Sequence, residues 1–281
     1  MSKLSVAEKM LHCTVRIETI TSGGGKGTGT GFCFEHKIGE ERHRFIVTNK
    51  HVVKNKARGF IKFKLKSDDK PFHGPGYTLE LLEWNDAWFG HPDPDIDIAI
   101  TLLPALVDYI EKTNVGMEIF YTVAASQHIP SAEQLSDLDA LEEVKFVGYP
   151  NGMWDQSAWL PIIRTGTTAT PLANDFDGKP IFLIDASVFG GSSGSPVFIY
   201  DKMMHTTREQ STVFGPRFHF IGVISAVYQK VDQNEVRPKP IPTATGLIAI
   251  QKQNIDIGIV IKARTVVETI EALMATWSEK E

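Results

Sequence analysis

The sequence predicts an all-β barrel or sandwich, and three observations support this prediction. Short segments alternate apolar and polar residues, as in Val15, Ile17 and Thr19, which is the period of a half-buried strand. Turn-forming residues separate these segments at regular spacing along the chain. A polar, acidic stretch over residues 126–140, which contains Pro130, divides the chain into two β-rich halves and is interpreted as a linker.

The N-terminal half begins with a short helix expected over Ser5–Met10. The expected strands that follow are Cys13–Ile20, Gly31–Glu35, Arg44–Val53, Phe60–Lys66, Thr78–Asp86 and Asp97–Leu103, with a helical turn or two over Leu106–Lys112. The glycine-rich residues Ser22–Gly31 lack the spacing of a phosphate-binding loop. We therefore expect a mobile loop there and no nucleotide site.

The C-terminal half shows the same strand pattern and ends in a helix. The expected strands are Val144–Gly148, Leu160–Thr170, Ile181–Ile184, Val197–Tyr200, Phe218–Val227, Leu247–Ile250 and Ile257–Ile261. Asp201–Val213 and Gln229–Pro242 are polar or proline-rich and are expected to form loops. Thr265–Trp277 carries its apolar residues in a helical stripe.

Composition narrows the functional classes. The 281 residues carry a net charge of −5, which argues against a general nucleic-acid or membrane-surface binder. No apolar run approaches the length of a membrane span, and Met1–Glu18 does not have the pattern of a signal peptide. We therefore expect a cytoplasmic protein in which the two cysteines, Cys13 and Cys33, are free and buried.

The chain is organised around the Gly/Ser-rich stretch Asp185–Phe198, which separates two apolar runs. Such a turn between strands can present one serine hydroxyl and direct backbone N–H groups at one point. Acyl transfer needs that combination of a nucleophile and donors for the oxyanion. The alternative is an ordinary surface loop, because turns favour the same residue types.

A histidine and an aspartate occupy matching positions upstream. His51 follows an apolar, β-branched run, and Asp97 stands at the head of another, with Asp93 and Asp95 as competitors for its role. A serine nucleophile needs a base, and the base needs an orienting acid. The chain order His, Asp, Ser is that of the chymotrypsin-like fold.

With these motifs the chain resembles the trypsin-like serine peptidases of the chymotrypsin fold, in particular the bacterial HtrA/DegP-like branch, here expected without a PDZ domain. The matching segments are Thr28–Phe32, Ile46–Val53, Asp97–Ile100, Asp185–Ala186 and Gly191–Pro196. The resemblance implies two six-stranded antiparallel β-barrels and a C-terminal α-helix. The implied divisions are an N-terminal barrel over 1–125, a linker over 126–140, a C-terminal barrel over 141–264 and a helix over 265–281.

The resemblance also implies roles for single residues. Ser193 is the expected nucleophile, His51 the general base and acid, and Asp97 the group that orients His51. The backbone N–H groups of Gly191 and Ser193 are expected to form the oxyanion hole, and Ser225 to support the aspartate.

Two positions depart from the trypsin motif. Ser192 replaces its aspartate, so activation by N-terminal cleavage is not expected, and Ser195 replaces its last glycine.

The resemblance places Ser187 at the base and Val227 at the wall of the pocket for the P1 residue, whose carbonyl is attacked. Ser225 is expected to pair with substrate through its backbone. An uncharged base offers no partner to Lys or Arg. We therefore expect a serine endopeptidase that forms an acyl-enzyme and prefers a small or medium uncharged P1 residue in a protein or peptide substrate.

Alternatives remain open at this point. Gly190–Gly194 also fits the Gly-x-Ser-x-Gly motif with Ser192 as an α/β-hydrolase nucleophile. That fold needs an Asp and then a His after the serine, together with alternating strands and helices. The only histidines that follow, His205 and His219, lie near or inside β-rich sequence, which argues against this fold. A catalytically latent module that binds peptides by strand addition is a stronger alternative. Another hypothesis is that the peptide unit at Gly190–Gly191 stays flipped until a regulatory partner protein orders the neighbouring loops. No His/Cys spacing resembles a zinc site, so neither a metal nor another cofactor is expected.

Overall fold

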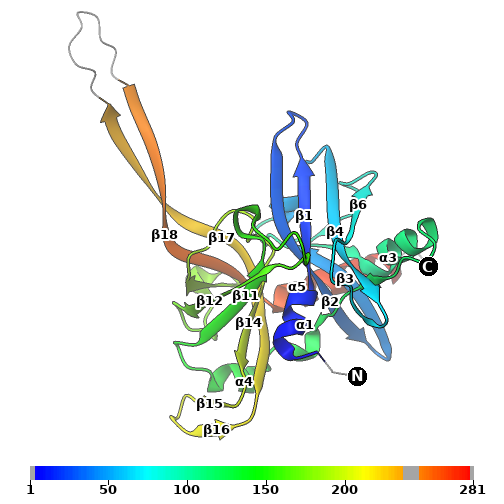
Figure 1. The fold of residues 1–281 in the computed structure, drawn as a ribbon. Helices are drawn as coiled ribbons and strands as arrows, with labels where there is room; N and C mark the ends of the chain where they lie inside the picture. The colour runs from blue at the N-terminus through cyan, green and yellow to red at the C-terminus, as the bar shows by residue number, and fades with distance from the viewer. Residues whose placement is uncertain (1–3, 237–246, 279–281) are drawn as a thin grey trace, which may run out of the picture.

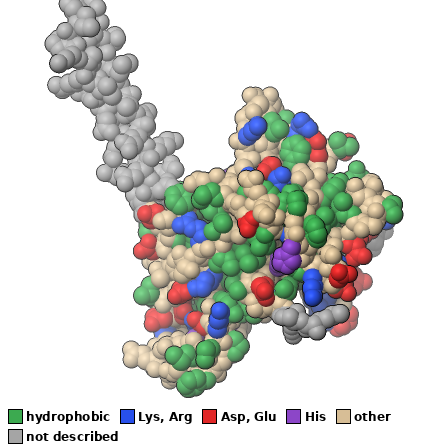
Figure 2. Space-filling model, viewed as in Figure 1, with side chains coloured by type: hydrophobic (Ala, Val, Ile, Leu, Met, Phe, Trp, Pro, Cys, Tyr) green, Lys and Arg blue, Asp and Glu red, His purple; other side chains and the backbone are tan. Residues whose placement is uncertain are grey.

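The computed structural model describes the backbone of residues 4–236 and 247–278, and the side chains of residues 4–227 and 256–277. Two β-rich halves lie side by side (Figure 1). Figure 2 shows acidic and basic side chains interspersed over one face of the molecule.

The N-terminal half contains ten strands and three helices among the described residues. They are α1 (Val6–His12), β1 (Thr14–Ile20), β2 (Lys26–Ile38), β3 (Glu41–Thr48), α2 (Lys50–Val53), β4 (Arg58–Ser67), β5 (Lys70–Pro71), β6 (Tyr77–Leu81), β7 (Phe89–Gly90), β8 (Ala99–Leu102), α3 (Leu103–Thr113), β9 (Ile119–Phe120) and β10 (Ala124–Ala125). Helix α1 begins with a capping box, in which the Ser5 hydroxyl accepts from the Glu8 N–H and the Glu8 carboxylate accepts from the Ser5 N–H. The expected N-terminal helix is therefore confirmed.

The remaining elements form the C-terminal half. They are η1 (Ser126–His128), α4 (Ala132–Asp137), β11 (Glu143–Gly148), η2 (Pro150–Gly152), β12 (Ile162–Thr168), η3 (Phe176–Gly178), β13 (Ile181–Asp185), β14 (Pro196–Asp201), β15 (Met204–Thr206), β16 (Thr212–Phe214), β17 (Arg217–Val236), β18 (Leu247–Lys262) and α5 (Arg264–Ser278). The expected C-terminal helix is present as α5, which contacts β18 of the second half and β7 and β8 of the first.

Only the C-terminal sheet closes into a barrel within the described residues. Its six strands follow the order β11-β12-β13-β18-β17-β14. The N-terminal sheet runs β5-β4-β1-β2-β3-β8-β7, and it stays open. The expected mostly β fold with a closed six-stranded barrel is confirmed, whereas the described residues do not show a second closed barrel. At the edge of this open sheet β7 is only two residues long, and residues 82–87 between β6 and β7 form turns.

The glycine-rich segment Ser22–Gly31, expected to be a mobile loop, is largely strand. Strand β2 starts at Lys26 and pairs with β1 from Ile20↔Lys26 onward. Its glycines leave room for neighbouring side chains: a Cβ at Gly29 would lie 2.5 Å from Val52 Cγ1, and one at Gly31 would lie 2.9 Å from Ile46 Cγ2. Close packing explains these glycines better than flexibility does.

Other element boundaries differ from the expectation. The strand expected over Arg44–Val53 ends at Thr48, and α2 carries His51. The loop expected over Asp201–Val213 contains the hairpin of β15 and β16. The two strands expected over Leu247–Ile250 and Ile257–Ile261 are one strand, β18, whose pairing with β17 continues to Val236↔Leu247. Residues 229–236 of the loop expected over Gln229–Pro242 therefore belong to β17, and its remainder lies outside the described residues.

Three apolar clusters form the core. One lies within the N-terminal sheet and includes Ile17 and Ile46. One fills the closed barrel and includes Phe146 and Phe182. The third joins side chains of both halves with Ile270 of α5. Because this third cluster is shared, it fixes the two halves against each other at the junction where the candidate site lies.

Candidate active site

Ser193 lies in the turn between β13 and β14, and the glycines around it shape this turn. Gly191 and Gly194 have φ angles of +86° and +87°, a region that favours glycine. A Cβ on Gly194 would lie 1.9 Å from the carbonyl oxygen of Thr30, so only glycine fits there. The turn thus brings the second half into contact with β2 of the first.

The three serines of this turn differ in exposure. Ser192 and Ser195 are 1% and 0% exposed, and both hydroxyls are buried without a hydrogen-bond partner among the described residues. Ser193 is partly exposed. Of the three, Ser193 is the one whose hydroxyl a substrate can reach.

His51 on α2 contacts Asp97, which lies just before β8. Nδ1 of His51 is 2.5 Å from Oδ2 of Asp97, and the backbone N–H of His51 donates to Oδ1 at 3.0 Å. The His51 side chain is 50% exposed and that of Asp97 is 26% exposed. Asp93, one competitor for this role, accepts instead from the backbone N–H of Asp95 at 2.9 Å.

Ser225 on β17 connects Asp97 to Ser193. Its hydroxyl donates to Oδ2 of Asp97 at 2.8 Å, and its backbone carbonyl accepts from the Ser193 hydroxyl at 3.2 Å. Within the described part of the chain, no hydrogen bond joins the Ser193 hydroxyl to His51. All four residues nevertheless meet at the junction of the two halves.

Two opposing influences act on the Asp97 carboxyl. Burial raises its pKa, while the hydrogen bonds and charge of His51, with the hydrogen bond from Ser225, lower it. The lowering influences together exceed the effect of burial, so the pKa lies below its usual value. Asp97 is therefore ionised at neutral pH and can stabilise a positive charge on His51.

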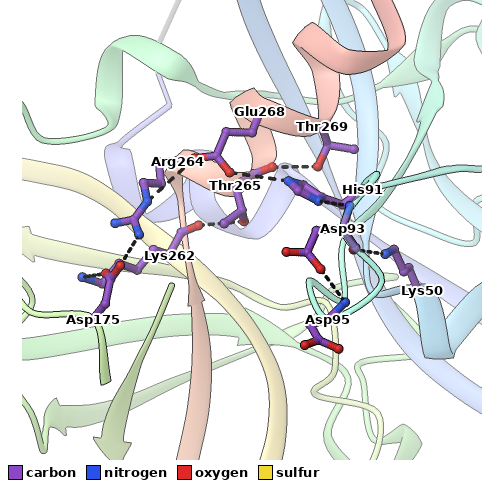
Figure 3. A network of polar contacts seen from close by, with 10 residues as sticks. All are labelled: Lys50, His91, Asp93, Asp95, Asp175, Lys262, Arg264, Thr265, Glu268 and Thr269. Carbon is purple, nitrogen blue, oxygen red and sulfur yellow. Dashed lines mark hydrogen bonds and ion pairs between the residues drawn. The ribbon is translucent and has the colours of Figure 1, made fainter. Parts of the chain in front are cut away.

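The loop that carries Asp97 is held from two sides. Lys50, next to His51, donates from Nζ to the backbone carbonyl of Asp93 at 2.7 Å, and Nδ1 of His91 accepts from the Asp93 N–H at 3.0 Å. Nε2 of His91 lies 3.5 Å from Oε2 of Glu268 on α5 (Figure 3). These contacts fix the loop relative to α2 and α5, so His51 and Asp97 are positioned together.

The buried Asn49 adds a further tie, which sequence reasoning did not identify. Its side-chain amide donates from Nδ2 to the backbone carbonyl of Asp97 at 2.8 Å. The signal available was its place in the Ile46–Val53 motif, directly before the helix that carries His51.

The backbone at Gly190 and Gly191 is anchored on both sides. The carbonyl of Gly190 accepts from the Asn151 N–H at 2.5 Å, and the carbonyl of Gly191 accepts from the Thr30 hydroxyl at 2.9 Å. Among the described residues, the N–H groups of Gly191 and Ser193 have no hydrogen-bond acceptor. Two neighbouring donors are thus free to bind a negatively charged oxygen.

Thr30 is a second contributor that sequence reasoning missed, although the Thr28–Phe32 motif contains it. Its backbone N–H donates to the Ser193 carbonyl at 2.9 Å, and its hydroxyl also accepts from the Tyr149 N–H at 3.2 Å. Its own carbonyl accepts from the Thr48 hydroxyl at 2.7 Å. Thr30 therefore holds the serine turn against the N-terminal sheet.

The predicted substrate-binding residues lie near this turn. Ser187 precedes Ser193 in the same connection, and its carbonyl accepts a hydrogen bond from Nη1 of Arg164 on β12. Val227 is two residues beyond Ser225 on β17 and packs against the core of the closed barrel. Both side chains are half-buried.

Other predictions concern thiols, metals and membranes. Cys13 and Cys33 are free and buried, as expected. No group of three or more metal-ligating side chains gathers within the described residues. Among the helices described, none combines the length and apolar character that crossing a membrane requires.

Comparison with known proteins addresses the family and the fold. The family model of the trypsin-like peptidase domain matches residues 29–202, whereas no curated protein matches the sequence.

Solved structures with a similar fold include a serine endoprotease from Yersinia pestis, at 14% identity and a TM-score of 0.50, covering 98% of this chain and 68% of that one. The HtrA-type protease AlgW with a tripeptide gives 13% identity and a TM-score of 0.48, covering 95% of this chain and 62% of that one. An active form of a protease from M. tuberculosis gives 16% identity and a TM-score of 0.42, covering 95% and 82%.

The family match has direct consequences because it extends over more than half of the chain. It contains the segments that carry His51, Asp97 and Ser193, and it runs from β2 of the open sheet to β14 of the closed barrel. The chain therefore belongs to the trypsin-like peptidase domain family and is a serine-type peptidase.

Proposed function

We propose that this protein is a serine endopeptidase that cleaves peptide bonds with His51, Asp97 and Ser193 through an acyl-enzyme. The observation that supports the proposal is the unbroken series of contacts from Ser193 through Ser225 and Asp97 to His51. A reachable serine, a histidine with an ionised carboxylate behind it and two free N–H donors supply the groups that acyl transfer requires.

The reaction begins with the Ser193 hydroxyl. A rotation about the Cα–Cβ bond releases Oγ from the Ser225 carbonyl and turns it toward Nε2 of His51. Oγ then attacks the carbonyl carbon of the substrate as Nε2 takes its proton. The carbonyl oxygen becomes negatively charged and accepts hydrogen bonds from the N–H groups of Gly191 and Ser193.

The second half of the cycle returns the proton. The imidazolium of His51 protonates the leaving amine, the C–N bond breaks, and the acyl group stays on Ser193. Water then attacks the ester while His51 takes a proton from it. The bond between the acyl carbon and Oγ breaks, His51 returns that proton to Oγ of Ser193, and the acid product leaves. Asp97 stays ionised throughout and stabilises the imidazolium through the contact with Nδ1.

The proposed substrate is a peptide segment of a protein. Ser187 brings no carboxylate to the P1 pocket, so a Lys or Arg at P1 lacks a partner there. By themselves, Ser187 and Val227 favour a small or medium uncharged P1 residue.

A latent module is the second candidate function, and one observation favours it. The Ser193 hydroxyl bonds the Ser225 carbonyl rather than His51. In such a module the site binds peptides, or it becomes active only when a regulatory partner protein orders it.

Labelling with a fluorophosphonate probe tests the proposal. The wild-type protein, Ser193→Ala, Ser192→Ala and Ser195→Ala would be compared, and turnover of a quenched fluorescent peptide library would be measured in parallel. We expect labelling and turnover in all except Ser193→Ala. Loss of labelling in Ser192→Ala with retention in Ser193→Ala would contradict the assignment, and an unlabelled wild-type protein would favour the latent module.

A further inference from the structure

Arg164 points toward the interior of the closed barrel. On β12 it pairs with Phe146 of β11, and side chains of directly opposed residues in an antiparallel pair lie on the same face of the sheet. Phe146 is 1% exposed and belongs to the barrel core. An arginine at this position brings a positive charge to a largely apolar surrounding.

The guanidinium group of Arg164 reaches the segment that leads to Ser193. Its Nη1 donates to the carbonyl of Ser187, and its Cζ lies 5.1 Å from the ring centroid of Phe189 and 5.6 Å from that of Phe146. The charge therefore lies beside Ser187 and close to two aromatic rings, and these contacts favour its orientation.

Unlike Arg217 and Lys262, which are also partly or fully buried, Arg164 has no described carboxylate partner. Arg217 pairs with Glu142 at 2.6 Å, and Lys262 pairs with Asp175 at 2.7 Å. Arg164 forms no ion pair with any described acidic residue, and its described hydrogen bonds use only one N–H. A half-buried guanidinium with free donors is a favourable partner for an anion, because a fork of N–H groups matches a carboxylate.

The position of the Arg164 guanidinium relative to the bound substrate determines which substrate group it can contact. The attacked carbonyl carbon lies at Ser193 Oγ, and its oxygen faces the N–H groups of Gly191 and Ser193. The resemblance to the trypsin-like peptidases places the P1 side chain in a pocket with Ser187 at its base and Val227 at its wall. Because Arg164 donates to the Ser187 carbonyl, its charge lies next to the residue expected at the base of that pocket.

We propose that Arg164 binds the carboxylate of a Glu or Asp side chain at P1, so that the enzyme cleaves after acidic residues. The proposal rests on the proposed function, whose P1 pocket it specifies. It replaces the preference for an uncharged P1 residue that Ser187 alone suggests. Arg164 is 23 residues from Ser187 in the chain, so the sequence motif around the serine does not include it.

Two peptides that differ only in Glu or Gln at P1 test this assignment. We expect kcat/KM of the wild-type enzyme to be about 10- to 100-fold higher for the Glu peptide, the range for a hydrogen-bonded charged partner. Arg164→Gln should reduce the Glu/Gln ratio to about one, and Arg164→Lys should keep the ratio above one. Arg58→Gln is the matched control, since Arg58 is 56% exposed on β4 and pairs with Glu80, and its ratio should stay unchanged.

The ratio separates recognition from a purely structural role. If Arg164 only supported the Ser187 carbonyl, Arg164→Gln would lower both rates equally and leave the ratio unaltered, which would overturn the proposal. A wild-type ratio of one, or a preference for Gln, would overturn it as well.

Binding to Ser193→Ala separates this proposal from the proposed function. The dissociation constants of the same two peptides would be measured by calorimetry with Ser193→Ala and with Ser193→Ala/Arg164→Gln. Tighter binding of the Glu peptide that disappears in the double variant supports the assignment, even if the wild-type protein cleaves neither peptide and the proposed function fails. Equal binding of both peptides to Ser193→Ala contradicts the assignment, while fluorophosphonate labelling still reports on the function.

Discussion

The carbonyl oxygen of Gly190 accepts a hydrogen bond from the backbone N–H of Asn151 at 2.5 Å. The peptide unit that joins Gly190 to Gly191 is trans, because the chain contains no cis peptide bond among its described residues. In a trans unit the C=O and N–H groups point in opposite directions, so the N–H of Gly191 points away from Asn151. A flipped peptide unit would break the contact with Asn151, so Asn151 favours the arrangement with a free N–H on Gly191.

Alanine substitutions at the two glycines should therefore have different effects. A Cβ at Gly191 would lie 2.4 Å from the Tyr149 carbonyl oxygen, and its φ is +86°. Gly191→Ala should displace this N–H and lower kcat/KM by about 10²- to 10³-fold, the effect of losing one oxyanion donor. Gly190 has open space around its Cβ position and no positive φ. Gly190→Ala should stay close to wild type in peptide cleavage assays, and comparable activity of both variants would refute the assigned donor.

Thr30 should affect both stability and activity through its side chain. Thr30→Val leaves the buried Gly191 carbonyl without its donor and the Tyr149 N–H without its acceptor. We expect the free energy of unfolding to fall by about 2 kcal/mol or more, since each buried unsatisfied group costs about 1–3 kcal/mol. Urea titration measures this loss, and Thr30→Ser, which keeps the hydroxyl, should recover most of it. Equal stability of Thr30→Val and the wild type would show that these contacts contribute little.

The Asp97 carboxyl should make stability depend on pH in the acid range. Because its folded pKa lies below the reference value of 3.8, the folded state favours the ionised form. The stability it contributes is present above that reference value and is lost as pH falls through the folded pKa. We therefore expect the wild type to lose stability relative to Asp97→Asn as pH falls from about 5 to about 2. Urea titration of both proteins over this range measures the difference in their free energies of unfolding. A difference that is constant over this range would contradict the lowered pKa.

The two thiols should be unreactive in the folded protein. Burial raises the pKa of Cys13 to about 12, and burial also raises the pKa of Cys33. The thiolate is the reactive form, so a disulfide reagent at about pH 8 should modify neither cysteine in the native state and both in denaturant. Rapid modification of the native protein would mean that this part of the core opens readily.

The local pattern of apolar and polar residues is enough to predict most of the strands and the helices near both ends of the chain. Alternation predicts β1 and β4, and the helical stripe predicts α5, because each side chain pattern matches one regular backbone. The prediction of a mobile loop at the glycine-rich start of β2 is wrong, because this segment is held as a strand by pairing with β1 and by close packing of Val52 and Ile46. Whether a sheet closes depends on pairing between strands far apart in the chain, so local pattern does not reveal that the N-terminal sheet is open.

The sequence by itself determined the β-rich architecture, the His51, Asp97 and Ser193 order and the glycines that shape the turn at Ser193. Each of these follows from residue type and near neighbours in the chain. The tertiary structure decided which aspartate meets His51, which serine is reachable and how Thr30, Asn151 and Arg164 surround the site. Those contacts join residues far apart in the chain, and their geometry exists only once the two halves have packed against each other.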